Sequence, residues 1–476
     1  MVVYIIGAGP GDPELLTIKA KRLIKRAEVL IYDKLINKSI INWAPSNCLL
    51  IYVGKRENES KKSQKIQKEI NDMLLKYGDN KRVVRLKGGD PFIFGRGGEE
   101  ALICANADIR FEIVPGISSF YAAPAYAGIP ISHREYNSVF AVLTGHESEK
   151  AKSAIDWSRL PETLFVLMGV SKIRELATNL LNIGRDPTTP VAAVKWGTTI
   201  KQKTIMTDLA GLAKGIEDLD PPVVFVIGKI ASLHSKLNWF ESKLSIAKGK
   251  KVVLTRARNR IKESEELMKT YGLKPINMPL IDVTSRDFNL PDLDNFNSLI
   301  FTSVEGIKRF IDKVDISGFN GSIFCIGPKT KEFLLKQTGI NSTIGNKYNS
   351  QGLAKVILDN LKKGSRILSI RSSAASKILM ELLSTKFDVT EIYVYDIIQL
   401  EFDPELIKGT DAIFVMSASC AKILEKLDHN YFKNLTVVAI GPETSRFLTI
   451  PHITATEYTL NGMINEYLNY LWSDLK

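Results

Sequence analysis

The chain has 476 residues, a formal net charge of +12, 45% hydrophobic residues and 24% charged residues. This length exceeds what one hydrophobic core supports, so we expect two or more domains, and the composition excludes a disordered or fibrous protein. No apolar run approaches the roughly 18 residues of a membrane span, and the first residues show no signal-peptide pattern, so we expect a cytoplasmic protein with no membrane partner.

The cysteines and histidines exclude two further kinds of site. Cys48, Cys104, Cys325 and Cys420 are scattered without a CxxC pair, which argues against a disulfide framework or a zinc site. The five histidines show no metal-ligand spacing either. We therefore expect no metal.

Strand-like and amphipathic helical segments alternate along the chain, beginning with residues 2–7, 13–27 and 29–33. Such alternation predicts an α/β fold with parallel sheets covered by helices. The segment 242–249, SKLSIAKG, interrupts the apolar pattern, and a new strand begins at Lys251. We predict a first domain over 1–242, a linker over 243–249 and a second domain over 250–476.

The first turn, IIGAGPGD at 5–12, has the outline of a dinucleotide-binding loop, with Asp33 about 20 residues later where a ribose-binding acid would stand. However, Asp12 replaces the third glycine and places a carboxylate where pyrophosphate would lie, and Pro10 lacks an N–H donor. A ligand without phosphates, or a purely structural turn, fits this loop better than a nicotinamide dinucleotide.

The segment 87–100, KGGDPFIFGRGGEE, contains five glycines and follows a strand predicted at 82–86. It would lie at the carboxyl end of that strand, where open α/β sheets bind ligands. Glycine is used where backbone must approach a ligand closely. We interpret the segment as the wall of a pocket, with a solvated loop as the alternative.

The second half contains an internal repeat. The pair IFTS and CIGPKT recurs as FVMS and AIGPET, and Ser303 aligns with Ser417 at the same offset, 114 residues, as Thr330 with Thr444. A shared offset predicts two duplicated lobes, with chance as the alternative. Each motif is a strand, a turn and a helix, which gathers hydroxyls and backbone N–H groups where anions bind.

Several motifs of the first half occur in the order found in uroporphyrinogen-III C-methyltransferases: GAGPGDPELLT, YDKL, YVGKR, KGGDPFIFGRGGEE, VPGISS, AGIPISHR, TGH, MGVSK and WGTT. Residues 1–235 resemble this family. The resemblance implies a two-lobed tetrapyrrole methylase fold with S-adenosylmethionine between the lobes, and a polycarboxylate tetrapyrrole as substrate rather than nucleic acid. It also implies a homodimer formed through this half. A cofactor without phosphates agrees with Asp12.

The resemblance also implies roles for individual residues. Asp33 of YDKL would accept a proton and Lys55 of VGKR would donate one, with a helix cap and a solvated lysine as the alternatives. His133 and Arg134 would contact substrate carboxylates, with a surface turn as the alternative. The implied cofactor contacts are Pro10, Gly88, Gly89, Asp90, Ile93, Ser118, Ser119, Met168 and Gly197.

Residues 250–476 resemble uroporphyrinogen-III synthases through KVVLTRAR, IFTS, CIGPKT, SQGLAKVIL, EIYVYD and AIGPET. The resemblance implies one lobe of 250–284 with 398–476 and an inserted lobe of 285–397, which close hydroxymethylbilane without a cofactor. Tyr395 matches the tyrosine that would assist departure of hydroxide. The implied substrate contacts, each of which could instead be a helix N-cap, are Thr302, Ser303, Thr330, Ser417, Ser419 and Thr444.

The sequence thus predicts a bifunctional enzyme. The second half would cyclise hydroxymethylbilane to uroporphyrinogen III with inversion of the last pyrrole, and the first half would methylate this product twice to precorrin-2, for siroheme or cobalamin. The alternative is a methylase of another tetrapyrrole or of RNA, joined to a non-catalytic two-lobed binding module.

Overall fold

The computed structural model of the chain describes residues 2–45, 47–54, 63–145, 155–217, 219–258, 261–289, 292–345 and 349–474. The chain divides into two compact units, Met1–Ala247 and Lys248–Lys476. The division falls inside the predicted linker, most of which belongs to a helix, α9 Phe240–Ile246. The exact domain bounds stay a prediction. Within the described ranges, no helix is long and apolar enough to cross a membrane.

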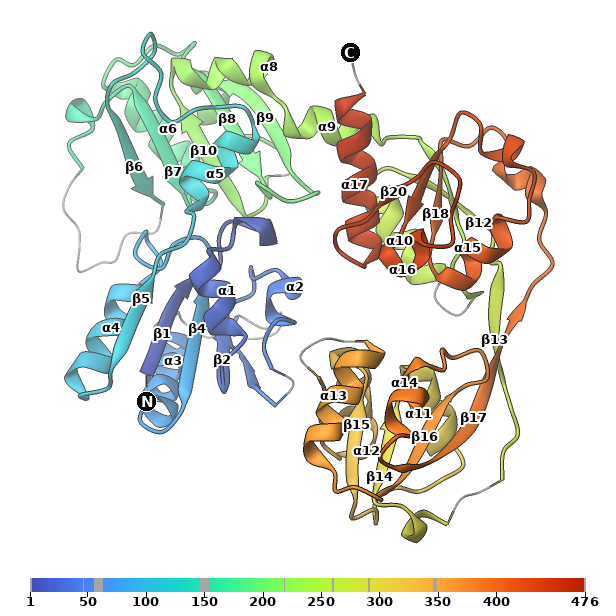
Figure 1. Cartoon of the computed structure of the whole chain (residues 1–476). Coiled ribbons are helices and arrows are strands. Elements are labelled where there is room, and N and C mark those ends of the chain that lie inside the picture. The colour runs from blue at the N-terminus through green and yellow to red at the C-terminus, as the bar shows by residue number, and fades with distance from the viewer. Residues whose placement is uncertain are drawn as a thin grey trace. The chain divides into compact units, whose positions relative to one another are not determined.

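The first unit begins with a parallel sheet in the order β3-β2-β4-β1-β5 (Figure 1). Its strands are β1 Val2–Gly7, β2 Val29–Tyr32, β3 Leu49–Tyr52, β4 Arg82–Lys87 and β5 Phe111–Val114. The helices are α1 Ile18–Ile24, α2 Lys38–Ile41, α3 Ser63–Gly78 and α4 Gly97–Asn106. Apolar clusters fill both faces of the sheet, as expected for parallel strands covered on two sides.

The helix expected over 13–27 is divided into a 3₁₀ turn, η1 Pro13–Leu15, and α1. Leu16 between them is extended, with φ −74° and ψ 136°. Thr17 then begins α1, because its Oγ1 accepts the Ala20 N–H at 3.1 Å. A threonine that caps a new helix competes with continuation of the old one, which explains the break.

The second sheet of this unit has the order β6-β7-β10-β8-β9. Its strands are β6 Phe140–Thr144, β7 Thr163–Leu167, β8 Pro190–Lys195, β9 Lys203–Asp208 and β10 Val223–Ile227. Its helical elements are α5 Ser119–Tyr126, η3 Trp157–Arg159, α6 Ile173–Asn182, α7 Leu209–Lys214, η4 Lys229–Leu233 and α8 His234–Leu237. The expectation of parallel sheets is wrong here, because β10 pairs antiparallel with β7 and β8, and β8 with β9. The link between β8 and β9, residues 196–202, is too short for a parallel crossover.

The second unit contains two sheets, of which the first, β12-β11-β18-β19-β20, is parallel. Its elements are β11 Lys251–Leu254, α10 Ile261–Thr270, β12 Lys274–Asn277, η7 Pro404–Ile407, β18 Ala412–Val415, α15 Ala418–Leu424, η8 His429–Phe432, β19 Thr436–Ala439, α16 Pro442–Ser445, β20 Ile453–Thr454 and α17 Leu460–Ser473. The chain leaves this sheet after β12 and returns at β18. An intervening segment of the sequence therefore forms the other sheet.

That other sheet has the order β13-β17-β16-β14-β15. Its elements are β13 Ile281–Ser285, η6 Leu293–Asn295, β14 Ser298–Phe301, α11 Val304–Ile311, β15 Ser322–Cys325, α12 Pro328–Thr338, α13 Ser350–Asn360, β16 Arg366–Ser372, α14 Ile378–Leu383 and β17 Asp388–Gln399. β13 and β17, which carry the chain out and back, pair antiparallel and run side by side in Figure 1.

The two copies of the internal repeat have the same local structure. Ser303 has φ −160° and ψ 157° before α11, and Ser417 has φ −164° and ψ 162° before α15. Each serine Oγ accepts the N–H of the residue three positions later, at 2.9 and 3.2 Å. Gly327 and Gly441 are likewise both extended where they precede α12 and α16. The prediction of duplicated lobes is confirmed for the backbone conformation and the helix caps of the two motifs.

Candidate active sites

Three glycine-containing turns meet at the carboxyl end of the first sheet, after β1, β4 and β5. A Cβ atom added to Gly7 would lie 2.5 Å from the Gly89 carbonyl oxygen and 2.6 Å from the Gly116 Cα. Gly9 and Gly89 also exchange two backbone hydrogen bonds, of 3.2 and 2.7 Å. Backbones can pack this closely only where side chains are absent. The glycines of the segment 87–100 therefore serve partly to let the turns pack together.

The Asp90 carboxylate ties two of these turns to each other. Its Oδ1 accepts the Phe92 N–H at 2.8 Å, and its Oδ2 accepts the Gly116 N–H at 2.9 Å. A Cβ atom added to Gly89 would lie 3.6 Å from the Ser119 backbone nitrogen, at the start of α5. Five predicted cofactor residues are thus neighbours: Gly88, Gly89, Asp90, Ser118 and Ser119.

Asp12 joins the turn after β1 to the second lobe of the unit. Its Oδ1 accepts the Glu14 N–H at 2.9 Å and caps η1, while its Oδ2 accepts the Tyr126 hydroxyl at 2.8 Å. The Asp12 N–H in turn donates to Thr198 Oγ1 at 3.2 Å. The acid that takes the place of the third glycine therefore has a structural task. Pro10 lies in the same turn.

The remaining predicted cofactor residues come from three loops. A Cβ atom added to Gly197, after β8, would collide with the Ala123 Cβ, so α5 packs directly on that loop. Met168, after β7, has a φ of 52° and is 46% exposed. Ile93, in the turn after β4, is 40% exposed. Because β10 lies between β7 and β8, Met168 and Gly197 stand on non-adjacent strands.

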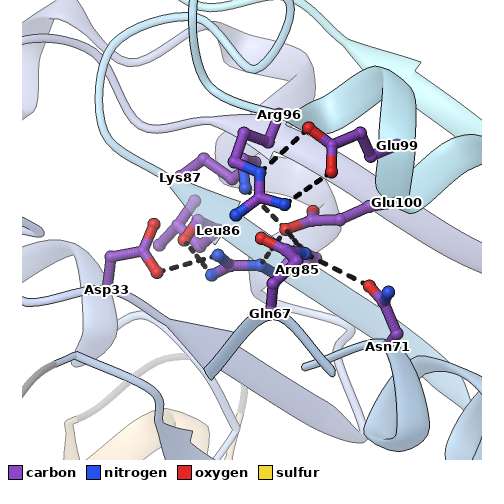
Figure 2. Close-up of polar contacts among 9 residues, drawn as sticks. All are labelled: Asp33, Gln67, Asn71, Arg85, Leu86, Lys87, Arg96, Glu99 and Glu100. Atoms are coloured by element: carbon purple, nitrogen blue, oxygen red, sulfur yellow. Dashed lines mark hydrogen bonds and ion pairs between the residues drawn. The ribbon is translucent and has the colours of Figure 1, made fainter. Parts of the chain in front are cut away.

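A chain of alternating charges lies beside the turn that follows β4 (Figure 2). Asp33 Oδ1 accepts a hydrogen bond from Arg85 Nη2 at 2.8 Å. Glu100 Oε1 accepts from Arg85 Nε at 3.2 Å and from Lys87 Nζ at 2.6 Å. Arg85, Lys87 and Glu100 are buried, whereas the Asp33 side chain is 33% exposed. Of these four side chains, Asp33, the predicted proton acceptor, is the one that is partly exposed to solvent.

Burial governs the electrostatics of this network. It lowers the pKa of Lys87, and the positive charge of Arg85 lowers that pKa further. Burial also disfavours the charged form of Arg85, but Asp33 and Glu100 outweigh it and raise the pKa of Arg85. Glu100 Oε2 has no hydrogen-bond partner among the described residues. The charge of Glu100 is therefore compensated mainly through Oε1, and loss of either cation would be costly.

We predicted no individual role for Arg85, Lys87 or Glu100, although Lys87 and Glu100 lie at the two ends of the predicted pocket wall and the sequence holds a signal for the buried cations. Two of the three cations of β4, Arg85 and Lys87, are two residues apart, so both side chains lie on one face of a buried strand. Buried cations require an acidic partner. A second pair with no predicted role is also drawn in Figure 2: Arg96 donates to both carboxylate oxygens of Glu99, at 2.9 and 2.6 Å, and both side chains are exposed.

Lys55 lies outside the described residues. His133 and Arg134 lie in a turn between α5 and β6, where the His133 N–H donates to Asn137 Oδ1 at 2.9 Å and His133 Nδ1 accepts the Glu135 N–H at 3.2 Å. The Arg134 side chain is exposed. These bonds hold the turn together and do not involve the network around Asp33. The role of both residues as substrate contacts stays a prediction.

In the second unit, Tyr395 and Ser303 come together. The Tyr395 hydroxyl lies 3.0 Å from Ser303 Oγ, which also caps α11 through the Gly306 N–H. Tyr395 is buried, and burial raises the pKa of its hydroxyl, although the hydrogen bond with Ser303 opposes this. Tyr395 therefore keeps its proton at neutral pH and can donate it in a hydrogen bond.

The other predicted hydroxyls of this unit also lie where a helix follows a strand, either in the preceding turn or in the first turn of the helix. Ser417 caps α15 as Ser303 caps α11, so the N-cap interpretation is correct for both. The remaining four are partly or fully buried: Thr302, Thr330, Ser419 and Thr444. A substrate contact stays a prediction for all six.

Two family models match the chain: Tetrapyrrole (Corrin/Porphyrin) Methylases over residues 2–213, and Uroporphyrinogen-III synthase HemD over 262–465. The uroporphyrinogen-III C-methyltransferase of Bacillus subtilis (strain 168) is 46% identical over 51% of this chain and 95% of its own. The S-adenosyl-L-methionine-dependent uroporphyrinogen III methyltransferase of Methanosarcina barkeri is 45% identical over 49% of this chain and 94% of its own. The porphyrin biosynthesis protein HemD of Ruminiclostridium josui is 30% identical over 98% of this chain and 97% of its own.

The chain belongs to both families. Its first unit is a tetrapyrrole methylase and its second a uroporphyrinogen-III synthase, so the fusion predicted from the sequence is confirmed. The predicted α/β fold class and a bifunctional enzyme of tetrapyrrole biosynthesis are confirmed with it. The match to the Ruminiclostridium protein along almost the whole chain indicates that the two domains occur together in a relative.

The residues of the methylase unit fit S-adenosylmethionine better than a dinucleotide. Asp12 and Asp90 place two carboxylates at the glycine turns, where they would repel a pyrophosphate. S-adenosylmethionine has a sulfonium and no phosphate. Ile93, in the turn after β4, and Met168, in the loop after β7, are partly exposed apolar residues. Such groups suit the apolar parts of a nucleoside ligand.

Proposed function

We propose that the synthase unit cyclises hydroxymethylbilane to uroporphyrinogen III and that the methylase unit methylates this product twice, giving precorrin-2. The observation that carries the proposal is the match to both families along nearly the whole chain. The product of one reaction is the substrate of the other, which gives the fusion a chemical reason. Precorrin-2 would then serve the biosynthesis of siroheme or cobalamin.

The methylase unit would hold S-adenosylmethionine with Pro10, Gly88, Gly89, Asp90, Ile93, Ser118, Ser119, Met168 and Gly197. When bound, this cofactor supplies the methyl group by cleavage of its sulfur–carbon bond. Asp33 accepts the proton that the alkylated pyrrole loses. Lys55 donates a proton to a carbon of the tetrapyrrole in a tautomer change that releases another proton, so one proton leaves overall for each methyl group gained. Oδ1 of Asp33 is bonded to Arg85, so Oδ2 is the oxygen that receives the proton.

In the synthase unit, the substrate loses its hydroxyl group as water while a new carbon–carbon bond closes the ring. Tyr395 donates a hydrogen bond to the departing hydroxyl, since its raised pKa keeps it protonated. The turns before α11, α12, α15 and α16 hold the carboxylates of the substrate, through backbone N–H groups and the six hydroxyls described above. Positioning of a flexible chain accounts for most of the acceleration.

The proposal extends to partners and location. A net charge of +12 suits polycarboxylate tetrapyrroles as the substrates. We propose no nucleic-acid partner, a cytoplasmic location and a homodimer formed through the methylase unit. Light scattering on the purified chain would test the dimer, and a monomer at micromolar concentration would contradict it.

The deciding experiment gives the purified chain hydroxymethylbilane with and without S-adenosylmethionine. We expect type-III porphyrin after oxidation in the absence of the cofactor, and a dimethylated product in its presence. Type-I porphyrin would refute the synthase activity and favour a non-catalytic binding module. Unmethylated type-III product throughout would refute methyl transfer to this substrate.

A further inference from the structure

We propose that Arg85 and Glu100 are positioning residues for methyl transfer, which act through Asp33. This rests on the proposed role of Asp33 as proton acceptor. With Lys87, the two side chains form a buried connection that begins at the partly exposed carboxylate of Asp33 (Figure 2). It ends at Lys87, the residue that precedes the glycine turn after β4.

The guanidinium of Arg85 is fixed from three directions. Nη2 donates to Asp33 Oδ1 at 2.8 Å, Nε to Glu100 Oε1 at 3.2 Å, and Nη1 to the Leu86 carbonyl oxygen at 3.2 Å. A planar fork held at three nitrogens has little freedom to rotate. The direction of the hydrogen bond from Arg85 to Asp33 is therefore fixed by the other contacts of the guanidinium, and this bond orients the Asp33 carboxylate.

Glu100 keeps the two buried cations of β4 together. Arg85 and Lys87 both donate to its Oε1, and without this carboxylate their positive charges would repel each other in a buried site. Lys87 immediately precedes Gly88, and its carbonyl oxygen accepts the Ala8 N–H at 2.7 Å. Glu100 thus links the orientation of Asp33 to the backbone of the glycine turns.

Stability alone gives no reason for this arrangement. β4 lies between β2 and β1 in the sheet, and Val83 precedes Arg85 on the same face. Buried ion pairs on such a strand are often no more stable than apolar side chains of similar volume. A partly exposed carboxylate that must keep one orientation, by contrast, needs a fixed charged partner such as Arg85 on its buried side.

The test is a double-mutant cycle between Arg85→Lys and Asp33→Asn in the full chain. Kinetics of uroporphyrinogen III methylation are measured for each variant, with the Kd for S-adenosylmethionine by calorimetry. A lysine keeps the charge but lacks the planar fork, so we expect kcat to fall roughly 10- to 100-fold. The cofactor Kd should change less than about twofold. Because Arg85 acts through Asp33, the double variant should be no slower than Asp33→Asn alone.

Glu100→Gln is a second test, because glutamine keeps the shape of glutamate and removes its charge. We expect a lower kcat and an unchanged cofactor Kd for this variant. Arg82→Lys is the matched control, because Arg82 lies on the same strand and pairs with Glu28 at the surface. Its kcat should equal that of the wild type. If the double variant loses kcat by the product of the two single losses, Arg85 does not act through Asp33 and the inference is overturned. Loss of cofactor binding in both Arg85→Lys and Glu100→Gln would also overturn it, since the network would then be structural. A wild-type chain that does not methylate uroporphyrinogen III would instead refute the proposed function.

Discussion

Replacing Gly7 by alanine should separate the turns that form the proposed cofactor site. The added Cβ would lie 2.5 Å from the Gly89 carbonyl oxygen and 2.6 Å from Gly116 atoms, all of them backbone. An ordinary contact begins near 3.4 Å, so the neighbouring turn must move by 3.4 minus 2.5, or 0.9 Å. A displacement of about 1 Å at a catalytic centre can cost about 100-fold in rate. Overpacking of this kind costs about 1–3 kcal/mol of folding free energy.

We therefore expect Gly7→Ala to reduce methylation by about 100-fold and to weaken S-adenosylmethionine binding, while cyclisation of hydroxymethylbilane is unchanged. Fluorescence-monitored urea unfolding measures the stability of the first unit, which holds four of the five tryptophans: Trp43, Trp157, Trp196 and Trp239. Gly318→Ala is the control, because no atom lies within 4 Å of its added Cβ. Wild-type cofactor affinity in Gly7→Ala would refute the idea that close backbone packing shapes the site.

Three further predictions concern single side chains. Asp33→Ala should abolish most methylation and leave cyclisation intact, measured with both substrates on one preparation, and equal loss of both activities would contradict the modular assignment. Tyr395→Phe should lower formation of type-III product while methylation of supplied uroporphyrinogen III continues, and an unchanged cyclisation rate would remove Tyr395 from the mechanism. Asp12→Ala should destabilise the first unit by about 1–3 kcal/mol, because it removes the cap of η1 and the acceptor of the Tyr126 hydroxyl. A urea midpoint equal to that of the wild type would show that neither bond matters.

The fold was predictable where hydrophobic pattern and short connections decide it. The strands β1, β2, β4 and β11 lie at the predicted positions. The antiparallel pairing of β8 and β9 was not predicted, because alternating strands and helices indicate parallel sheets in general and not the connection of each strand. The division of the helix over 13–27 depends on the local hydrogen bond of Thr17, which competes with helix propensity.

The methylase site was predictable from motifs, and its supporting contacts were not. Glycine density indicated the turns around Gly89, and Asp12 argued correctly against a dinucleotide before its contacts with Tyr126 were known. The partner of Asp33 is Arg85, which lies 52 residues away along the chain. The pairing of β2 with β4 brings these two side chains together, and Glu100 joins them from α4 through its contact with Arg85. A charged residue in an apolar strand indicates that a buried partner exists, but it does not say where the partner lies.

The synthase unit shows that an internal repeat predicts a shared scaffold without predicting which copy carries the chemistry. Ser303 and Ser417 have nearly the same backbone conformation and cap their helices in the same way, yet Ser303 also contacts Tyr395. Tyr395 comes from β17, a strand of 12 residues, whereas the strand at the matching place in the other sheet, β12, has four. The pairing of β16 with β17 shifts register just before Ser372, which places Tyr395 opposite that serine. A bulge of this kind redirects a side chain, so the duplicated lobes differ chemically through one extended strand and its irregularity.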